Sequence, residues 1–252
     1  MKKPAFTKAL IVGASSDMAR SFAQILAKNK IDVVLAGRNL NELEADAANL
    51  QIRYGIDAKT MLLDITNDKG RTDGVKALQA KHKDVSLVAV FAGYLGDQKK
   101  AQTDTAESVK IIESNYTGAV LFLELAASYL TKQTGRRAIV GVSSVAGDRG
   151  RQSNYLYGSA KAGFTAYLSG LRNRLHHEGI PVLTVKPGFV KTAMTKDLDL
   201  PPVITATADQ AAADIYKAVL KKKNVIYTLW MWRYIMMIIG CIPEAVFKKL
   251  KL

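Results

Sequence analysis

Short apolar runs alternate with amphipathic stretches along most of this chain, and this alternation constrains the fold more than any other feature of the sequence. Each apolar run is uncharged and rich in Val, Ile or Leu, as is typical of strands buried on both faces. The runs are Ala9–Val12, Val33–Leu35, Met61–Leu63, Val85–Phe91, Ala138–Val142 and Val182–Val185. The amphipathic stretches fall near residues 18–28, 40–54, 68–82, 105–132 and 157–178. This order predicts right-handed βαβ units in an α/β fold of the Rossmann type, with a doubly wound parallel sheet between two helical layers.

The chain shows no internal repeat and no low-complexity linker, so we expect one domain. We place this dinucleotide-binding and catalytic domain at residues 1–224, and a short apolar, aromatic and basic tail at residues 225–252. Residues 191–207 contain two consecutive prolines and no clear periodicity, which predicts a loop that covers the substrate.

A turn suited to phosphate binding follows the first apolar run. Gly13 permits a sharp strand-to-helix turn, and the next helix offers free N–H groups and a positive dipole end to a pyrophosphate. We therefore expect Gly13, Ser15, Ser16 and Met18 to contact a dinucleotide. Asp17 stands where glycine-rich loops have glycine. It can cap the helix, but its charge opposes a phosphate unless it points away.

The end of the second apolar run predicts NADP(H) as the cofactor. Ala36 leaves space where NAD sites carry an acid, and Arg38 supplies a positive charge for a 2′-phosphate. Arg38 at a helix start opposes the helix dipole, which favours this role over that of a solvated surface residue. Asp64 is placed to accept from the adenine amino group, to cap the next helix, or to do both. Other expected cofactor contacts are Ile65, Ala92 and Gly93.

Tyr157 and Lys161 are four residues apart, which places them on one face of a helix. Ser144 lies just past the fifth apolar run, and Asn115 lies in the helical stretch before that run. Carbonyl reduction needs a proton donor at the oxygen, and an adjacent ammonium is expected to lower the pKa of a tyrosine toward neutrality. Ser144 offers a hydroxyl that can polarise the carbonyl.

Together with the segment around Lys186-Pro187-Gly188, this pattern resembles the short-chain dehydrogenase/reductase family over nearly the whole chain. The resemblance implies that Ser144, Tyr157 and Lys161 are catalytic, and that Asn115 completes the set through a water molecule on the lysine. It also implies that Lys161 and Tyr157 contact the cofactor. The segment expected to hold the nicotinamide comprises Pro187, Gly188, Val190 and Thr192.

Three stretches are similar to decaprenylphosphoryl-2-keto-ribose reductases, which reduce a keto-sugar on a polyprenyl phosphate and share an acid at the position of Asp17. These stretches are Leu95–Gln98, Ser143–Arg149 and Trp230–Leu250. In place of the family's usual Asn-Asn-Ala-Gly, this chain has Val90–Gly93, which puts hydrogen bonds on the adenosine side in doubt.

These observations predict an NADP(H)-dependent oxidoreductase that interconverts a ketone and a secondary alcohol on a hydrophobic or lipid-linked substrate. The alternative is a regulatory or scaffold protein that binds the cofactor without turnover. A sugar epimerase or dehydratase fits less well, because the roughly 60 residues after Thr192 leave little room for a substrate domain. No metal-ligand spacing is present, so we expect no metal site.

A net charge of +14 suggests a polyanionic neighbour. The sequence has no zinc-finger or RNP pattern, so we expect no nucleic-acid partner. One cysteine and no signal peptide predict a cytoplasmic protein. The tail is too short to span a membrane and carries Arg233 at its centre. It contacts the inner face of the membrane peripherally, or packs on its own core or a partner subunit, and the two can coexist. We expect a homo-oligomer, in which Ala119–Leu130 forms either an interface helix or core.

Overall fold

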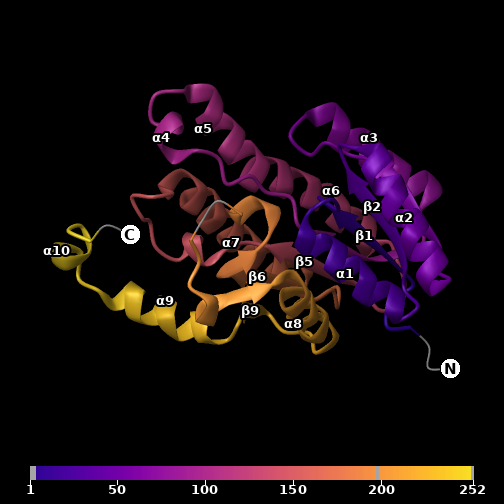
Figure 1. Ribbon diagram of the computed structural model, residues 1–252. Helices are drawn as coiled ribbons and strands as arrows, with labels where there is room; N and C mark the ends of the chain where they lie inside the picture. Colours follow the sequence, from indigo (N-terminus) through magenta and orange to yellow (C-terminus); the bar gives the residue numbers. More distant parts are fainter. Residues whose placement is uncertain (1–3, 197–198, 251–252) are drawn as a thin grey trace.

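The computed structural model describes residues 4–196 and 199–250, and it confirms the predicted three-layer α/β fold (Figure 1). The described strands of the central sheet are all parallel and run in the order β3-β2-β1-β4-β5-β6-β9. They are β1 (Lys8–Val12), β2 (Asp32–Gly37), β3 (Ala58–Leu62), β4 (Val85–Val90), β5 (Ala138–Val142), β6 (Val182–Pro187) and β9 (Val225–Thr228).

Helices cover both faces of this sheet. One core contains Ala9 and Ile11 of β1, whereas the other contains Leu10 and Val12, because successive strand residues point to opposite faces. This is why the strands are apolar throughout. The first face packs α1 (Asp17–Lys28), α2 (Leu40–Tyr54) and α8 (Ala208–Leu220). The second face packs α3 (Asp68–Lys81), α6 (Gly118–Thr131) and α7 (Tyr155–Leu175).

The predicted helical stretch at residues 105–132 is present, but it contains a π-helical turn. Helix α5 (Thr105–Ile112) continues through the turn Glu113–Thr117 into α6, and the short α4 (Gln98–Ala101) precedes it. Within the stretch that the sequence left open between core and interface, Phe122, Leu123 and Leu130 are buried while Leu121 and Leu125 are exposed. The helix therefore supplies core residues and also presents an apolar outer face.

Two regions are more ordered than the sequence suggested. The segment expected to be a loop contains two 3-10 turns and strand β8 (Thr205–Thr207), which pairs in parallel with β7 (Phe189–Lys191). Residues 197–198 of that segment lie outside the described part of the chain. Strand β9 extends the sheet four residues past the expected domain boundary at 224, since it pairs with β6. Helices α9 (Met231–Cys241) and α10 (Glu244–Phe247) follow it (Figure 1).

Helix α9 packs on the domain through one face. Trp232 is 3% exposed and its Nε1 donates a hydrogen bond to the carbonyl of Ile204 at 3.0 Å. A Cβ added to Gly188 would lie 1.9 Å from Trp232 Nε1, so only glycine fits beneath the indole. The opposite face exposes large apolar side chains, namely Trp230, Tyr234, Met237 and Ile238. Among the described residues, no helix has the length and apolarity needed to cross a membrane.

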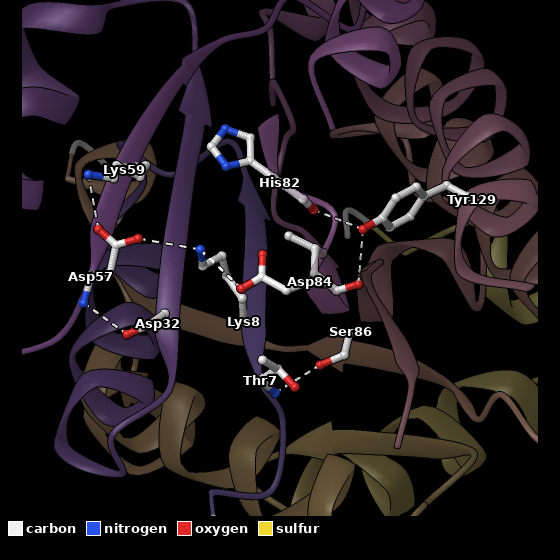
Figure 2. A network of polar contacts seen from close by, with 10 residues as sticks. Thr7, Lys8, Asp32, Asp57, Lys59, His82, Asp84, Ser86 and Tyr129 are labelled. Carbon is white, nitrogen blue, oxygen red and sulfur yellow. Dashed lines mark hydrogen bonds and ion pairs between the residues drawn. The ribbon is translucent and has the colours of Figure 1, made fainter. Parts of the chain in front are cut away.

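A network of hydrogen bonds and ion pairs links the amino ends of neighbouring strands (Figure 2). Lys8 at the start of β1 lies 3.3 Å from Asp57 and 3.2 Å from Asp84. Burial disfavours the charge of Lys8, but hydrogen bonds to the two carboxylates outweigh burial and raise the pKa of the ammonium. Parallel sheets bind ligands at the carboxyl ends of their strands. This network lies at the opposite edge and is therefore away from the expected binding site.

Candidate functional site

Two adjoining cavities open at the carboxyl ends of the strands. The first has a volume of about 320 Å³ and contains residues from the ends of β1, β2, β3 and β4. The second has a volume of about 160 Å³ and lies between the ends of β5 and β6 and the start of α7. Phe91, Gly93 and Met194 line both cavities. Every site residue expected from the sequence lines one of them, with the exception of Asn115.

The turn after β1 is built for close approach of the backbone. Gly13 has a φ of +76°, and a Cβ there would lie 2.6 Å from the backbone nitrogen of Ala92. The side chain of Ser16, and not that of Asp17, caps α1 by accepting from the backbone N–H of Ala19 at 3.4 Å. The Asp17 carboxylate instead accepts a hydrogen bond from the backbone N–H of Ala193 at 2.7 Å. Its charge is thus engaged by the segment that follows β7.

Arg38 and Asp64 both line the first cavity. Burial of Asp64 would raise its pKa, but hydrogen bonds from Thr66 and the nearby charge of Arg38 lower it overall. Thr66 donates to one carboxylate oxygen through its N–H at 2.9 Å and its hydroxyl at 2.7 Å. Asn67 caps α3 by accepting from the N–H of Gly70, so the alternative role of Asp64 as that cap is wrong.

Ser144 and Tyr157 are held together by a tight junction between the loop after β5 and helix α7. The Ser144 hydroxyl caps a 3-10 turn and accepts from the N–H of Ala146 at 3.1 Å. A Cβ on Gly147 would lie 2.7 Å from the nitrogen of Ala162, and one on Gly158 would lie 2.8 Å from the carbonyl oxygen of Ala146. These glycines let the turn rest directly on α7. Burial raises the pKa of Tyr157 to about 12, and hydrogen bonding with Ser144 acts in the opposite direction.

Lys161 is 3% exposed and lies one helical turn beyond Tyr157. Its Nζ donates to the carbonyl of Val142 at 3.1 Å and lies 5.7 Å from the centre of the Tyr157 ring. Burial lowers the pKa of Lys161 to about 8. The sequence led us to expect that this ammonium would lower the pKa of Tyr157, but burial outweighs any such effect and raises that pKa.

Asn115 is fully buried in the π-helical turn and positions the wall next to Lys161. Its Oδ1 accepts from the N–H of Tyr94 at 3.1 Å, and its Nδ2 donates to the carbonyls of Tyr94 at 2.6 Å and Ile111 at 2.8 Å. A Cβ on Gly93 would lie 3.0 Å from Asn115 Oδ1 and 3.3 Å from Lys161 Nζ. Both side chains therefore adjoin Gly93, where the two cavities meet.

Several residues of the cavity walls were not anticipated from the sequence. Arg151 and Asn154 line the second cavity, and both fall between Ser144 and Tyr157, so their position between two candidate catalytic residues was an available signal. Lys110 and Ser114 line the first cavity from helix α5 and the π-helical turn, and no local motif marks them.

The sequence and the fold of this chain are both similar to those of known proteins. The short chain dehydrogenase family profile matches residues 7–201. An uncharacterized oxidoreductase of Mycobacterium tuberculosis is 34% identical over 242 residues, which cover 96% of each chain. A short-chain dehydrogenase from Sphingobium yanoikuyae in complex with NADPH superposes with a TM-score of 0.81 at 22% identity, over 96% of this chain and 98% of that one. A short chain dehydrogenase from Burkholderia cenocepacia in complex with NADP gives 0.81 at 20% identity, over 98% of both chains. At these identities, the two solved structures show a shared fold.

Proposed function

The chain belongs to the short-chain dehydrogenase family, and from this premise we propose that it is an NADP(H)-dependent oxidoreductase that interconverts a ketone and a secondary alcohol. The observation that carries the proposal is the convergence of Ser144, Tyr157 and Lys161 in the second cavity, which adjoins the first cavity at Gly93.

The first cavity fits a dinucleotide phosphate. Gly13 leaves the backbone accessible where a Cβ would collide with Ala92, and the N-terminus of α1 follows directly. Ser15 and Ser16 line this cavity, as does Arg38, which suits a 2′-phosphate. The two structural neighbours named above are complexes with NADPH and NADP, which agrees with this choice of cofactor. When bound, the cofactor supplies or accepts the hydride.

The chain's own residues supply the remaining chemistry. In the reductive direction the Tyr157 phenol gives its proton to the carbonyl oxygen, while the Ser144 hydroxyl holds that oxygen by a hydrogen bond. The phenolate that remains lies beside the Lys161 ammonium, which is largely protonated at pH 7 because its pKa is about 8. Lys161 would also hold the nicotinamide ribose, with Asn115 positioned behind it.

Because burial raises the pKa of Tyr157 to about 12, the phenol is protonated at neutral pH and can act as the proton donor in reduction. The rival proposal of a scaffold protein without turnover is less well supported, because it gives no reason for Ser144, Tyr157 and Lys161 to line one cavity.

We extend the proposal to the substrate and the assembly. The second cavity is walled largely by apolar side chains such as Leu95, Val145 and Phe189, which suits a hydrophobic substrate. The exposed apolar face of α9 supports a peripheral contact with lipid and agrees with a lipid-linked substrate. The exposed side chains of the α5–α6 helical run support a homo-oligomer. They include Val109, Ile112, Tyr116, Leu121 and Leu125.

Oxidation of NADPH with a panel of ketones tests the activity. We expect turnover by the wild type, and we expect Tyr157→Phe to lose it while NADPH still binds, because the phenol is the proposed proton donor. Cofactor binding is followed by NADPH fluorescence in both proteins. Activity of Tyr157→Phe above a few per cent of wild type would remove this residue from its role.

A further inference from the structure

Arg151 is a cation in the wall of the second cavity that the proposed reaction does not use. It lines the same cavity as Ser144 and Tyr157. Its Nη2 lies 3.1 Å from the sulfur of Met236 on α9, and its Nε is buried without a hydrogen-bond partner in the described part of the chain. Arg151 as a whole is half-buried, and a guanidinium Nε that is buried without a partner is costly unless a ligand completes its surroundings.

No carboxylate forms an ion pair with this cation: burial lowers the pKa of Arg151, and the charge of Asp148, acting from a distance, opposes that shift. Within residues 4–196 and 199–250, no acidic side chain lies at ion-pair distance from Arg151. The nearby Asp148 carboxylate is taken up by Lys186 at 2.5 Å and by the hydroxyl of Tyr227 at 2.9 Å. Arg149, two residues before Arg151, shows the contrast, because its Nη2 pairs with Glu244 at 2.9 Å.

The charges in this cavity all have one sign. Arg151 and Lys161 are the charged side chains among its described lining residues, and both are basic. Lys161 already has a part in the proposed reaction. On the same wall, Asn154 Oδ1 is a buried acceptor without a partner among the described residues. The backbone N–H of Asn154 donates to the carbonyl of Arg151 at 3.2 Å, so the two residues belong to one turn that leads into α7 and Tyr157.

We propose that Arg151, with Asn154 beside it, forms a substrate subsite that binds an anionic group, a phosphate or a carboxylate, carried by the ketone or alcohol. The planar guanidinium can donate two parallel hydrogen bonds to such a group. Asn154 can accept from a hydroxyl of the same substrate. The inference rests on the proposed oxidoreductase function, since it names the class of substrate for the same cavity.

Three aryl methyl ketones test the subsite: 4-acetylphenyl phosphate, 4-acetylbenzoate and the neutral 4-methoxyacetophenone. The measured quantity is kcat/KM with NADPH for each anionic ketone, divided by kcat/KM for the neutral one, which cancels general effects on the enzyme. We expect Arg151→Gln to lower this ratio by roughly 10- to 100-fold relative to wild type, as for loss of a charge-assisted contact. Arg151→Lys should restore part of it. The two anions distinguish phosphate from carboxylate recognition.

Arg53→Gln is the matched control, because Arg53 is an exposed arginine on α2 that lines neither cavity. For Arg53→Gln, the ratio of kcat/KM for the anionic ketone to kcat/KM for the neutral ketone should equal that of the wild type. A second readout does not depend on turnover: phenyl phosphate is titrated calorimetrically into wild-type protein and each variant saturated with NADPH, so that the phosphate sites of the cofactor are filled. Wild type should bind it, and Arg151→Gln should bind at least tenfold more weakly.

The outcomes separate this inference from the proposed function. An unchanged ratio in Arg151→Gln, or equal binding of phenyl phosphate by wild type and Arg151→Gln, overturns the anion subsite while NADPH-dependent turnover stands. If the NADPH complex reduces none of the ketones, the redox proposal fails on these substrates, and the titration still decides whether Arg151 binds an anion. If NADPH does not bind to the folded protein, the proposed function is overturned and the inference with it.

Discussion

The carboxylate of Asp17 accepts a hydrogen bond at 2.7 Å from the backbone N–H of Ala193, a residue 176 positions further along the chain. The bond joins the first turn of α1, at the proposed phosphate site, to the 3-10 turn Ala193–Thr195. Met194 and Thr195 of that turn line the second cavity. Asp17 thus links the proposed cofactor site with the wall of the proposed substrate site.

Replacing Asp17 should loosen this wall. In Asp17→Ala the N–H of Ala193 loses its charged acceptor, a contact worth about 1 kcal/mol because it is exposed to solvent. We expect faster hydrogen–deuterium exchange in a peptide that spans residues 189–196, together with a several-fold lower kcat/KM. Asp17→Asn keeps an acceptor without the charge and should stay closer to wild type in exchange, while binding NADPH more tightly because a negative charge near the pyrophosphate is removed. Unchanged exchange in Asp17→Ala would show that the bond does not hold the segment.

The buried ammonium of Lys161 should make stability depend on pH. Its pKa is about 8 in the folded protein and 10.5 ordinarily, so between these values the unfolded chain binds more protons and the free energy of unfolding rises with pH. The cost of burying the charge, roughly 3 kcal/mol at most, is therefore present at pH 7 and relieved toward pH 10. We expect urea unfolding to show a larger free energy of unfolding for Lys161→Met than for wild type at pH 7. This difference between the two proteins should be smaller at pH 9.5.

Lys76→Met, on the exposed side of α3, serves as the control. Its difference from wild type in free energy of unfolding should not change between pH 7 and pH 9.5. The raised pKa of Tyr157 works in the other direction: its contribution to stability is complete below pH 10 and is lost as pH rises through about 12, outside the range compared here. A constant gap between wild type and Lys161→Met across the range would mean that the buried amine is not charged at pH 7.

Arg38 should account for the cofactor preference. It lines the first cavity beside Asp64, and a contact with a 2′-phosphate exists for NADPH but not for NADH. We expect wild type to bind NADPH more tightly than NADH, and Arg38→Ala to weaken NADPH binding by roughly 10- to 100-fold with little effect on NADH. Fluorescence titration measures both constants, with Arg53→Ala as the control. Equal affinity of wild type for the two cofactors would exclude this role for Arg38.

The sequence was sufficient for the features that depend on local pattern. The apolar runs predicted six of the seven described strands of the central sheet, β1 to β6, and the turn at Gly13 predicted the position of the first cavity, because buried parallel strands and sharp turns have strong local signatures. The seventh strand, β9, was missed because it is short and lies directly before the apolar residues of α9. Its pairing with β6 is a long-range event that no local pattern records.

The sequence also could not predict the roles of residues whose partners lie far away along the chain. Asp17 looked like a helix cap because it begins α1, yet its partner Ala193 comes from the far end of the chain. Arg151 is an isolated arginine in a loop, and only the fold reveals that it faces a cavity without an acid. The composition of the tail could not show which of its side chains pack on the domain and which are exposed. Trp230 and Trp232 are the same residue type, yet Trp232 is buried and Trp230 is exposed.

These two tryptophans make a matched pair for testing the tail. Trp232 is 3% exposed and lies against Gly188, whereas Trp230 is 72% exposed. We expect Trp232→Ser to lose about 3–5 kcal/mol of stability through loss of packing, measured by urea unfolding. We expect Trp230→Ser to keep its stability but to float less with liposomes that contain anionic lipid, because aromatic side chains and nearby lysines favour the interface. Neutral liposomes should bind wild type more weakly. If folded wild-type protein binds neither kind of liposome, the exposed face of α9 must serve a protein contact, and analytical ultracentrifugation of wild type and Trp230→Ser would then show a difference in oligomeric state.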